Sequence, residues 1–325
     1  MLRTIAQRSA QSVAVIVVMS FVVYMLIGLM PGDPIDLMIA GDPRMTPEDA
    51  QRLRAFYGVD TPLIERYWRW ATNALTGEFG YSRLFSRPVW NLMGPRLSNT
   101  FVLMFSAWTV AVVLGLTLGV IAAARNGGAV DSLVNAAAFT SAATPTFWLA
   151  LMLMILFSVK LQWLPANGFP TSANAGLAER AWHLVLPVAT LAVIETGAYA
   201  RFMRAAMIES LAADHVRTAR AKGASRLRVL LAHCFRNSMI SVVTIMALGF
   251  GNLFSGALVT EQMFAYPGMG RLIFDSIMGN DFNLALVALL FATAMTLVCN
   301  LAADLAYTLI DPRISLGARP EEQRR

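Results

Sequence analysis

Few side chains in this sequence could carry out covalent chemistry, and their spacing forms no catalytic or metal site. The three histidines, His183, His215 and His233, have neither metal-ligand spacing nor a nucleophile motif between them. The two lysines, Lys160 and Lys222, are followed by Leu and Gly, so neither belongs to the Lys-Ser/Thr pair of a phosphate-binding P-loop. We therefore expect this chain to have no catalytic residue, no metal, no cofactor and no ATPase activity of its own.

The composition indicates that most of the protein faces lipid. The 325 residues are 57% hydrophobic and 14% charged, with a mean hydropathy of +0.56. Soluble domains are about 45–50% apolar and about 25% charged. Cys234 and Cys299 are too few for a disulfide framework, and we expect them to be buried as small apolar side chains.

The apolar residues gather in runs long enough to cross a bilayer, which takes about 20 mostly apolar residues in a helix. Six runs meet this requirement: residues 9–32, 97–124, 132–159, 181–200, 237–260 and 282–303. The only Asp, Glu, Lys or Arg inside them is Glu195, in the fourth run. We therefore predict an all-α, polytopic membrane protein with six transmembrane helices.

The basic residues of the short loops set the predicted orientation. Lys and Arg gather on the side that holds the N-terminus, the 201–236 loop and the C-terminal tail, whereas the short loops opposite carry only Lys160, Arg180 and Arg271. Because short loops rich in Lys and Arg stay in the cytoplasm, both termini are predicted to be cytoplasmic. The net charge of +6 is then explained by topology, and we expect no binding of nucleic acid.

Glu195 is the one side chain of these runs whose position in the membrane requires an explanation. A carboxylate inside a span costs about 2.5 kcal/mol or more on insertion scales, so it is a functional candidate by default. It could contact the transported species. It could equally be a protonated or Arg-paired side chain that faces the helix bundle or another subunit, and the sequence leaves both alternatives open.

The outer segment, residues 31–99, is too long for a simple turn and contains signals of short helices. Thr46–Asp49 supplies a cap, a first-turn proline and two acids, and Thr61 with Pro62 opens another helix. Three aromatic residues of this second helix suit the lipid headgroup boundary: Tyr67, Trp68 and Trp70. We expect short helices on the outer surface, with a docking surface for an external partner as the alternative.

The inner loop, residues 201–236, has the pattern of two short helices around a glycine hinge. The first helix starts at Asp214, becomes basic towards its end and stops at Gly223. Ser225 can cap the second helix. Its apolar residues recur at helical spacing: Leu227, Leu230, Leu231 and Cys234. The loop could project into the cytoplasm for a function, or it could be a basic anchor that only sets topology.

Motifs in a fixed order extend along nearly the whole chain. The most specific is Arg217–Gly223. The others are Pro31–Pro34, Tyr57–Pro62, Gly77–Ser82, Arg96 and Leu97 with Thr100, His183–Pro187, Ala200 and Arg201 with Arg204, Glu261, Phe264, Pro267–Leu272, Asp304–Tyr307 and Asp311–Arg313. Together they resemble a permease subunit of a binding-protein-dependent ABC importer of the dipeptide, oligopeptide or nickel type, and specifically the first of its paired permeases. Arg217 stands where that family's Glu-Ala-Ala-x-x-x-Gly loop has Glu, and Ser241 replaces a usual proline.

The resemblance implies a type I ABC importer permease fold in a bacterial inner membrane. It implies that the chain forms half of the translocation path for di- or oligopeptides or, alternatively, for a nickel complex or another small solute. The implied partners are a second homologous permease, two cytoplasmic ATPase subunits that bind ATP and Mg, a periplasmic or lipid-anchored solute-binding protein, and membrane lipid. The expected domains are residues 1–96 (first span and outer loop), 97–311 (five-helix core) and 312–325 (cytoplasmic tail).

By the same resemblance, the first helix of the inner loop would couple the permease to the ATPase. The residues of this coupling loop are Asp214, His215, Val216, Arg217, Thr218, Ala219, Arg220, Ala221, Lys222 and Gly223. Its apolar members, Val216, Ala219 and Ala221, would pack in a groove of the ATPase. Gly223 would permit a sharp bend and a close backbone approach.

The lining of the translocation path is less evident from the sequence. Small residues of the fifth span, such as Gly249, Gly251 and Gly256, serve either helix packing or a lining with room for substrate. The candidate lining residues are Thr244, Asn252, Ser255 and Glu195. The alternative from another class is an ion-coupled secondary transporter with Glu195 as the coupling carboxylate, but the sequence lacks the internal repeat that it predicts.

Overall fold

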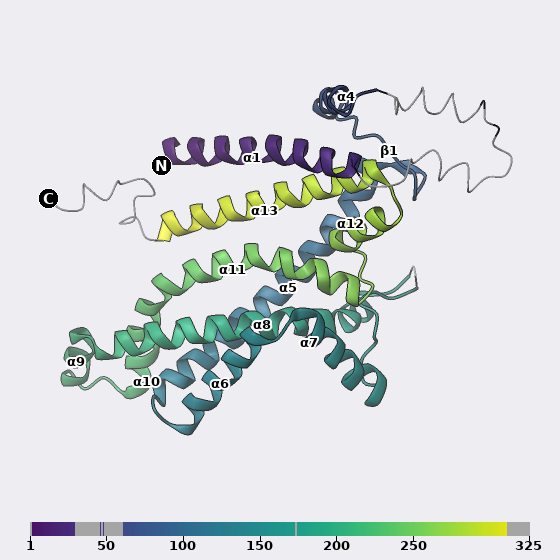
Figure 1. Ribbon diagram of the computed structural model, residues 1–325. Coiled ribbons are helices and arrows are strands. Elements are labelled where there is room, and N and C mark those ends of the chain that lie inside the picture. The colour runs from purple at the N-terminus through teal and green to yellow at the C-terminus, as the bar shows by residue number, and fades with distance from the viewer. Residues whose placement is uncertain (1, 30–45, 47, 49–60, 173, 311–325) are drawn as a thin grey trace. The chain divides into compact units, whose positions relative to one another are not determined.

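The computed structural model is almost entirely helical (Figure 1). It describes residues 2–29, 46, 48, 61–172 and 174–310, with the backbone alone at 2–5, 252, 255 and 303–310. The chain forms two compact units. The first consists of residues 1–5, 100–267 and 298–325, and the second of residues 6–99 and 268–297.

By length and composition the described helices give five membrane spans, or six when one bent pair is counted as a span, which is compatible with the six predicted. Among the described residues five are single helices: Ala6–Gly28, Val89–Ala124, Leu177–Ala212, Arg226–Gly251 and Phe282–Ala302. The sixth is a bent pair, α6 (Ala129–Ala143) and α7 (Thr146–Leu153), continued by the π-helix η1 (Met154–Lys160). The bend of 108° lies at Pro145, which lacks an N–H and holds Thr144 in extended geometry, with ψ at 121°.

The first unit is built around α8 (Leu177–Ala212), which packs against α6, α7 and α11 (Arg236–Met263). These helices can approach one another closely because glycines lie at their contacts. A Cβ on Gly119 of α5 (Val89–Ala124) would lie 2.6 Å from the Met203 Cβ, and one on Gly249 of α11 would lie 2.2 Å from the Tyr199 hydroxyl. Gly249 therefore serves helix packing, since even a methyl group has no space there.

The second unit includes α1 (Leu2–Gly28) from residue 6 onwards, α4 (Leu63–Leu75), α12 (Met269–Met278), and α13 (Phe282–Ile310) up to residue 297. Helix α4 begins directly after Thr61 and Pro62, as predicted. The helix predicted from Thr46 to Asp49 lies mostly outside the residues that the structure describes.

Tyr67, one of the three aromatic residues predicted to lie at the headgroup boundary, packs inside the protein. Tyr67 is buried, its hydroxyl lies 2.9 Å from that of Ser20 on α1, and its ring has edge contacts with Phe21 and Tyr24. Only Trp68 of the three aromatic residues projects freely, with 63% of its surface exposed. The sequence placed these residues on one helix, but it could not show that α4 packs its tyrosine against the first span.

A short hairpin completes the second unit. Strands β1 (Tyr81–Ser82) and β2 (Arg87–Pro88) pair antiparallel, with Tyr81 opposite Pro88. The buried carboxylate of Asp281 accepts hydrogen bonds from the Ser82 hydroxyl at 2.6 Å and from the Leu84 N–H at 2.9 Å. The hairpin is thus fixed to the turn between α12 and α13.

Candidate functional site

The inner loop folds as helix, glycine and helix, as predicted. Helix α9 spans Asp214–Ala221 and is separated from α8 by one extended residue, Ala213. Gly223 follows with φ of +81°, and its N–H donates to the Arg220 carbonyl at 2.9 Å. A Cβ at Gly223 would meet nothing within 4 Å. Within this chain, glycine is therefore needed for its backbone angle and not for close approach.

One face of α9 packs on the protein itself. Val216 is only 1% exposed and belongs to a buried cluster with Met207, Val229 and Cys234, while Ala219 packs at its edge. The expectation that Val216 would pack in a groove of another subunit is therefore wrong. Because α9 is short, its apolar residues are needed to hold it on the core.

The opposite face of α9 is exposed, polar and mainly basic. Arg217 lies 3.9 Å from Asp214, but both side chains are almost fully exposed, so this pair holds neither of them firmly. The exposed coupling-loop residues are Asp214, His215, Arg217, Thr218, Arg220, Ala221, Lys222 and Gly223. This face could contact a partner with acidic side chains or backbone acceptors.

The second helix of the loop runs without interruption into the fifth span. Ser225 caps it, and its hydroxyl accepts from the Arg228 N–H at 3.4 Å. Helix α10 (Arg226–Arg228) leads through the π-helix η2 (Val229–Phe235) into α11. A movement of this helix would therefore reach the fifth span directly.

The apolar face predicted for this second helix is partly wrong. Val229 and Cys234 are buried, whereas Leu227 and Leu231 are 66% and 52% exposed. The physical reason is the wider turn of the π-helix, which changes the residues that face the core relative to the 3.6-residue spacing assumed from the sequence.

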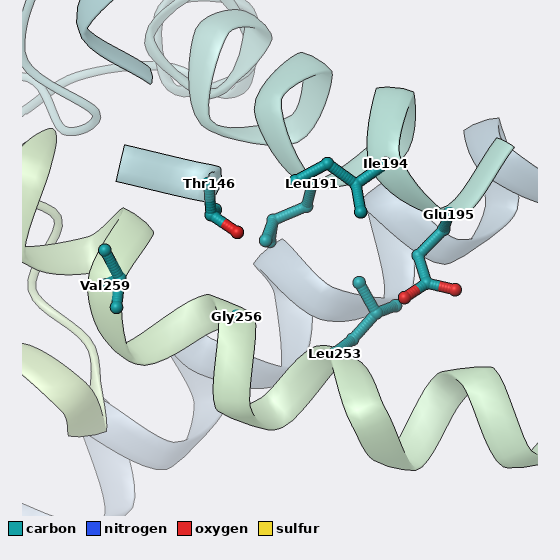
Figure 2. Close-up of a pocket in the computed structure, with 7 residues that line it drawn as sticks. All are labelled: Thr146, Leu191, Ile194, Glu195, Leu253, Gly256 and Val259. Carbon is teal, nitrogen blue, oxygen red and sulfur yellow. The ribbon is translucent and has the colours of Figure 1, made fainter. Parts of the chain in front are cut away.

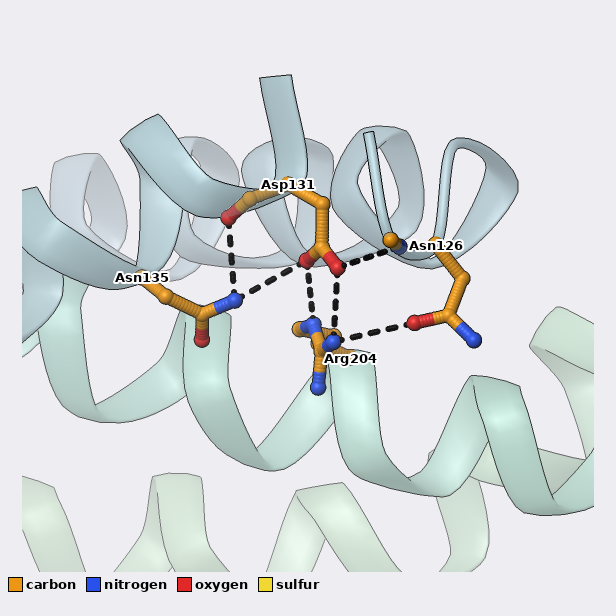
Figure 3. A network of polar contacts seen from close by, with 5 residues as sticks. Asn126, Asp131, Asn135 and Arg204 are labelled. Atoms are coloured by element: carbon orange, nitrogen blue, oxygen red, sulfur yellow. Dashed lines mark hydrogen bonds and ion pairs between the residues drawn. The ribbon is translucent and has the colours of Figure 1, made fainter. Parts of the chain in front are cut away.

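A polar network joins α8 to the start of α6 and to the loop that precedes it (Figure 3). Asp131 is 4% exposed and accepts from Arg204 through Nε at 2.5 Å and Nη2 at 2.7 Å. The Gly127 N–H and the Asn135 amide each donate to the same carboxylate at 2.9 Å, and Arg204 also donates to the Asn126 side chain at 3.0 Å. Such a bidentate, charge-assisted contact fixes the orientation of the guanidinium relative to the carboxylate as well as the distance between them.

A second arginine reaches the same region. The Arg226 guanidinium, at the start of the second inner helix, donates to the Ala124 carbonyl at the end of α5 at 2.7 Å. The segments that flank α9 are thus bonded to the end of α5 and to the start of α6. The sequence singled out Arg204 as part of a motif, but its partner is 73 residues away and could not be identified.

Glu261 and Phe264, at the end of α11, are structural. The Glu261 carboxylate is buried and accepts from the Thr100 hydroxyl at 2.5 Å, and the Phe264 carbonyl accepts from the Gly168 N–H at 2.6 Å. Burial and the nearby Glu261 carboxylate raise the pKa of the Tyr266 phenol. These contacts hold α5 and the loop around Gly168 to the end of α11.

A cavity of about 460 Å³ lies between α7, α8 and α11 (Figure 2). Its lining residues are Thr146, Leu191, Ile194, Glu195, Leu253, Gly256 and Val259. Of the four candidate lining residues, Glu195 lies in this cavity, while Thr244 is half-buried elsewhere on α11. The side chains of Asn252 and Ser255 lie outside what the structure describes.

The apolar lining residues were not identified from the sequence. Successive residues of the set Leu253, Gly256 and Val259 are three apart on α11, and on α8 Ile194 and Glu195 follow Leu191 by three and four, which is the spacing of neighbours on a helix face. This spacing could have identified each of the two helix faces from the sequence. It could not show that the two faces lie opposite each other, because that depends on the packing of α8 and α11.

Comparisons with known proteins agree with this architecture. Residues 115–316 match the family model "Binding-protein-dependent transport system inner membrane component", and residues 1–104 match the N-terminal model of such components. A protein of Brucella abortus named as a peptide transport system permease is 36% identical over 312 residues, which cover 95% of this chain and 98% of the relative. The oligopeptide transport system permease protein AppB of Bacillus subtilis is 33% identical, with the same coverage of both chains.

A solved structure shows the same fold. A chain of an amino acid ABC transporter, crystallised with histidines, superposes with a TM-score of 0.52 at 15% identity and covers 67% of this chain and 94% of its own. The fold of the chain is that of the membrane subunits of type I ABC importers.

Proposed function

Since this chain belongs to the family of inner membrane components of binding-protein-dependent transport systems, we propose that it forms half of the translocation path of an ATP-driven importer of peptides. The family acts in complexes with ATPases and binding proteins. The substrate class is supported by the relatives, which are named as permeases for peptides and oligopeptides.

The observation that carries the proposal is the exposed basic face of α9, held on the protein by Val216. An ATPase can drive a permease only through a rigid projection on its own side of the membrane. Helix α9 lies between the end of α8 and the start of the fifth span, and its neighbouring segments are bonded to the start of α6 through Arg204 and to the end of α5 through Arg226. Closure of the ATPases would then shift several spans together.

The partners in this proposal are a second, homologous permease, two cytoplasmic ATPase subunits and an external solute-binding protein. Hydrolysis of ATP, with its Mg, belongs to the ATPase subunits, and this chain contributes no catalytic residue. The chain crosses the inner membrane several times with both termini and α9 in the cytoplasm. The distribution of Lys and Arg over the short loops supports this orientation.

The function is tested with the whole complex reconstituted in liposomes with its binding protein. We expect trialanine uptake to require ATP and to continue when a protonophore removes the proton gradient. Uptake without nucleotide, or uptake abolished by the protonophore, would favour the ion-coupled alternative. The double variant Arg217→Glu, Arg220→Glu should stop uptake, whereas Arg125→Glu, an exposed arginine outside α9, should not.

A further inference from the structure

The cavity between α7, α8 and α11 has one charged group in an otherwise nearly apolar lining. Among the lining residues whose side chains the structure describes, Glu195 is the only ionisable one, and Thr146 supplies the only other polar side chain. The remaining walls are formed by aliphatic side chains and the bare backbone of Gly256. Figure 2 shows the carboxylate beside Leu253, with the aliphatic side chains of α8 and α11 around the space. A volume of about 460 Å³ is in the range of small-molecule sites, about 300–1,000 Å³.

The carboxylate of Glu195 has no cationic partner among the residues that the structure describes. Arg204, Arg217 and Arg271 pair with other carboxylates, those of Asp131, Asp214 and Asp275. The next cation along α8, Arg201, is directed elsewhere, with its guanidinium 5.1 Å from the centre of the Phe139 ring. The group beside it on α8 is the Tyr199 hydroxyl, which is neutral and cannot balance the charge of a carboxylate. A charged carboxylate in a span is costly unless it is paired, so a cation in this cavity would be favoured.

The walls determine which cation fits. A small hydrated metal ion prefers several oxygen ligands, and the described part of this lining offers one carboxylate and one hydroxyl. An ammonium group attached to an apolar body matches the lining better, because Glu195 would take the charge and Leu191, Ile194 and Val259 would contact the body. Gly256 keeps the space between α8 and α11 open, since a Cβ there would come within 3.2 Å of Leu191.

We propose that Glu195 binds the protonated amino terminus of a transported peptide as it passes through this cavity, with the first side chain of the peptide against the aliphatic walls. This inference rests on the function proposed above. It gives the permease a contact common to all peptides with a free amino terminus, independent of their side chains.

The first test is uptake of trialanine by the complete reconstituted complex at saturating binding protein. Glu195→Gln, which keeps the shape and removes the charge, should lower uptake about tenfold or more, while the complex still assembles and hydrolyses ATP. Glu195→Asp should retain part of the uptake. Glu209→Gln is the matched control, because Glu209 lies on the same helix but is exposed near its cytoplasmic end.

The second test asks whether the charge itself is what matters. Both cysteines of the chain are buried, so charged thiol reagents should modify Glu195→Cys selectively. Sulfonatoethyl methanethiosulfonate, which returns a negative charge, should raise the uptake of this variant. Trimethylammonioethyl methanethiosulfonate, which adds a positive charge, should abolish the remainder, and binding protein loaded with trialanine should slow both modifications.

Three results would overturn the inference: full uptake by Glu195→Gln, equal effects of the two reagents, or loss of the second permease from the purified Glu195→Gln complex. The last would place Glu195 at a subunit contact. Failure of the wild-type complex to take up trialanine with ATP would instead refute the proposed function. Normal uptake by both wild type and Glu195→Gln would refute the ammonium site alone.

Discussion

Substitution of Gly223 tests whether the geometry of the inner loop controls transport. Gly223 has φ of +81° and open space where a Cβ would be, so Gly223→Ala adds backbone strain without a steric clash. A left-handed conformation costs a residue with a Cβ about 1–2 kcal/mol. That corresponds to a loss of about five- to thirtyfold in the native loop relative to alternative conformations.

The effect should be graded among substitutions at this position. Gly223→Asn should be mildest, because asparagine tolerates the left-handed region best among residues with side chains. Gly223→Pro should be most severe. Proline fixes φ near −65°, against +81° here, and removes the N–H that donates to the Arg220 carbonyl.

The assay measures trialanine uptake and ATP hydrolysis by the same reconstituted complexes. We expect uptake per ATP to fall in the order glycine, asparagine, alanine, proline. Gly77→Ala is the matched control, because Gly77 has φ of +87° and equally open space but lies in the segment predicted to be outside. The reasoning fails if Gly77→Ala lowers uptake per ATP as much as Gly223→Ala, or if Gly223→Pro retains full uptake.

Three further predictions concern packing and polar contacts. Gly119→Ala should destabilise the purified complex by about 1–3 kcal/mol, because its Cβ would overlap a neighbouring side chain, whereas Gly94→Ala on the same helix has free space; thermal unfolding compares the two. Arg204→Lys keeps the charge but loses the two-pronged contact with Asp131, so it should lower the unfolding temperature, and an unchanged temperature would show that the contact contributes little. Tyr67→Phe should cost about 0.5–1.5 kcal/mol through the hydrogen bond lost to α1, which chemical denaturation can measure.

The spans could be predicted because each requires only a long apolar run, which is a local property of the sequence. The break in the third span was missed although Pro145 lies within its run. A run of uncharged residues shows how long an apolar segment is, but it does not show whether the helix in it is straight. The helix, glycine and helix of the inner loop could also be predicted, since the cap at Ser225 and the stop at Gly223 act locally.

The sequence could not show which residues contact one another when they lie far apart in the chain. Val216 was recognised as apolar, but whether it packs on this protein or on another depends on the distant residues Met207 and Cys234. Asp131 and Arg204 are joined only because α6 and α8 pack together. Glu195 was identified by its rarity in a span, whereas the cavity around it needs the faces of two further helices.

The length of α8 has a mechanical consequence. Glu195 and Ala212, the last residue of the helix, are separated by about 25 Å of continuous α-helix at 1.5 Å per residue. That stretch contains no proline or glycine after Gly197, so it can tilt like a stiff rod but has no joint at which to fold. A displacement imposed at the α9 end of the helix would therefore arrive at the carboxylate almost undiminished.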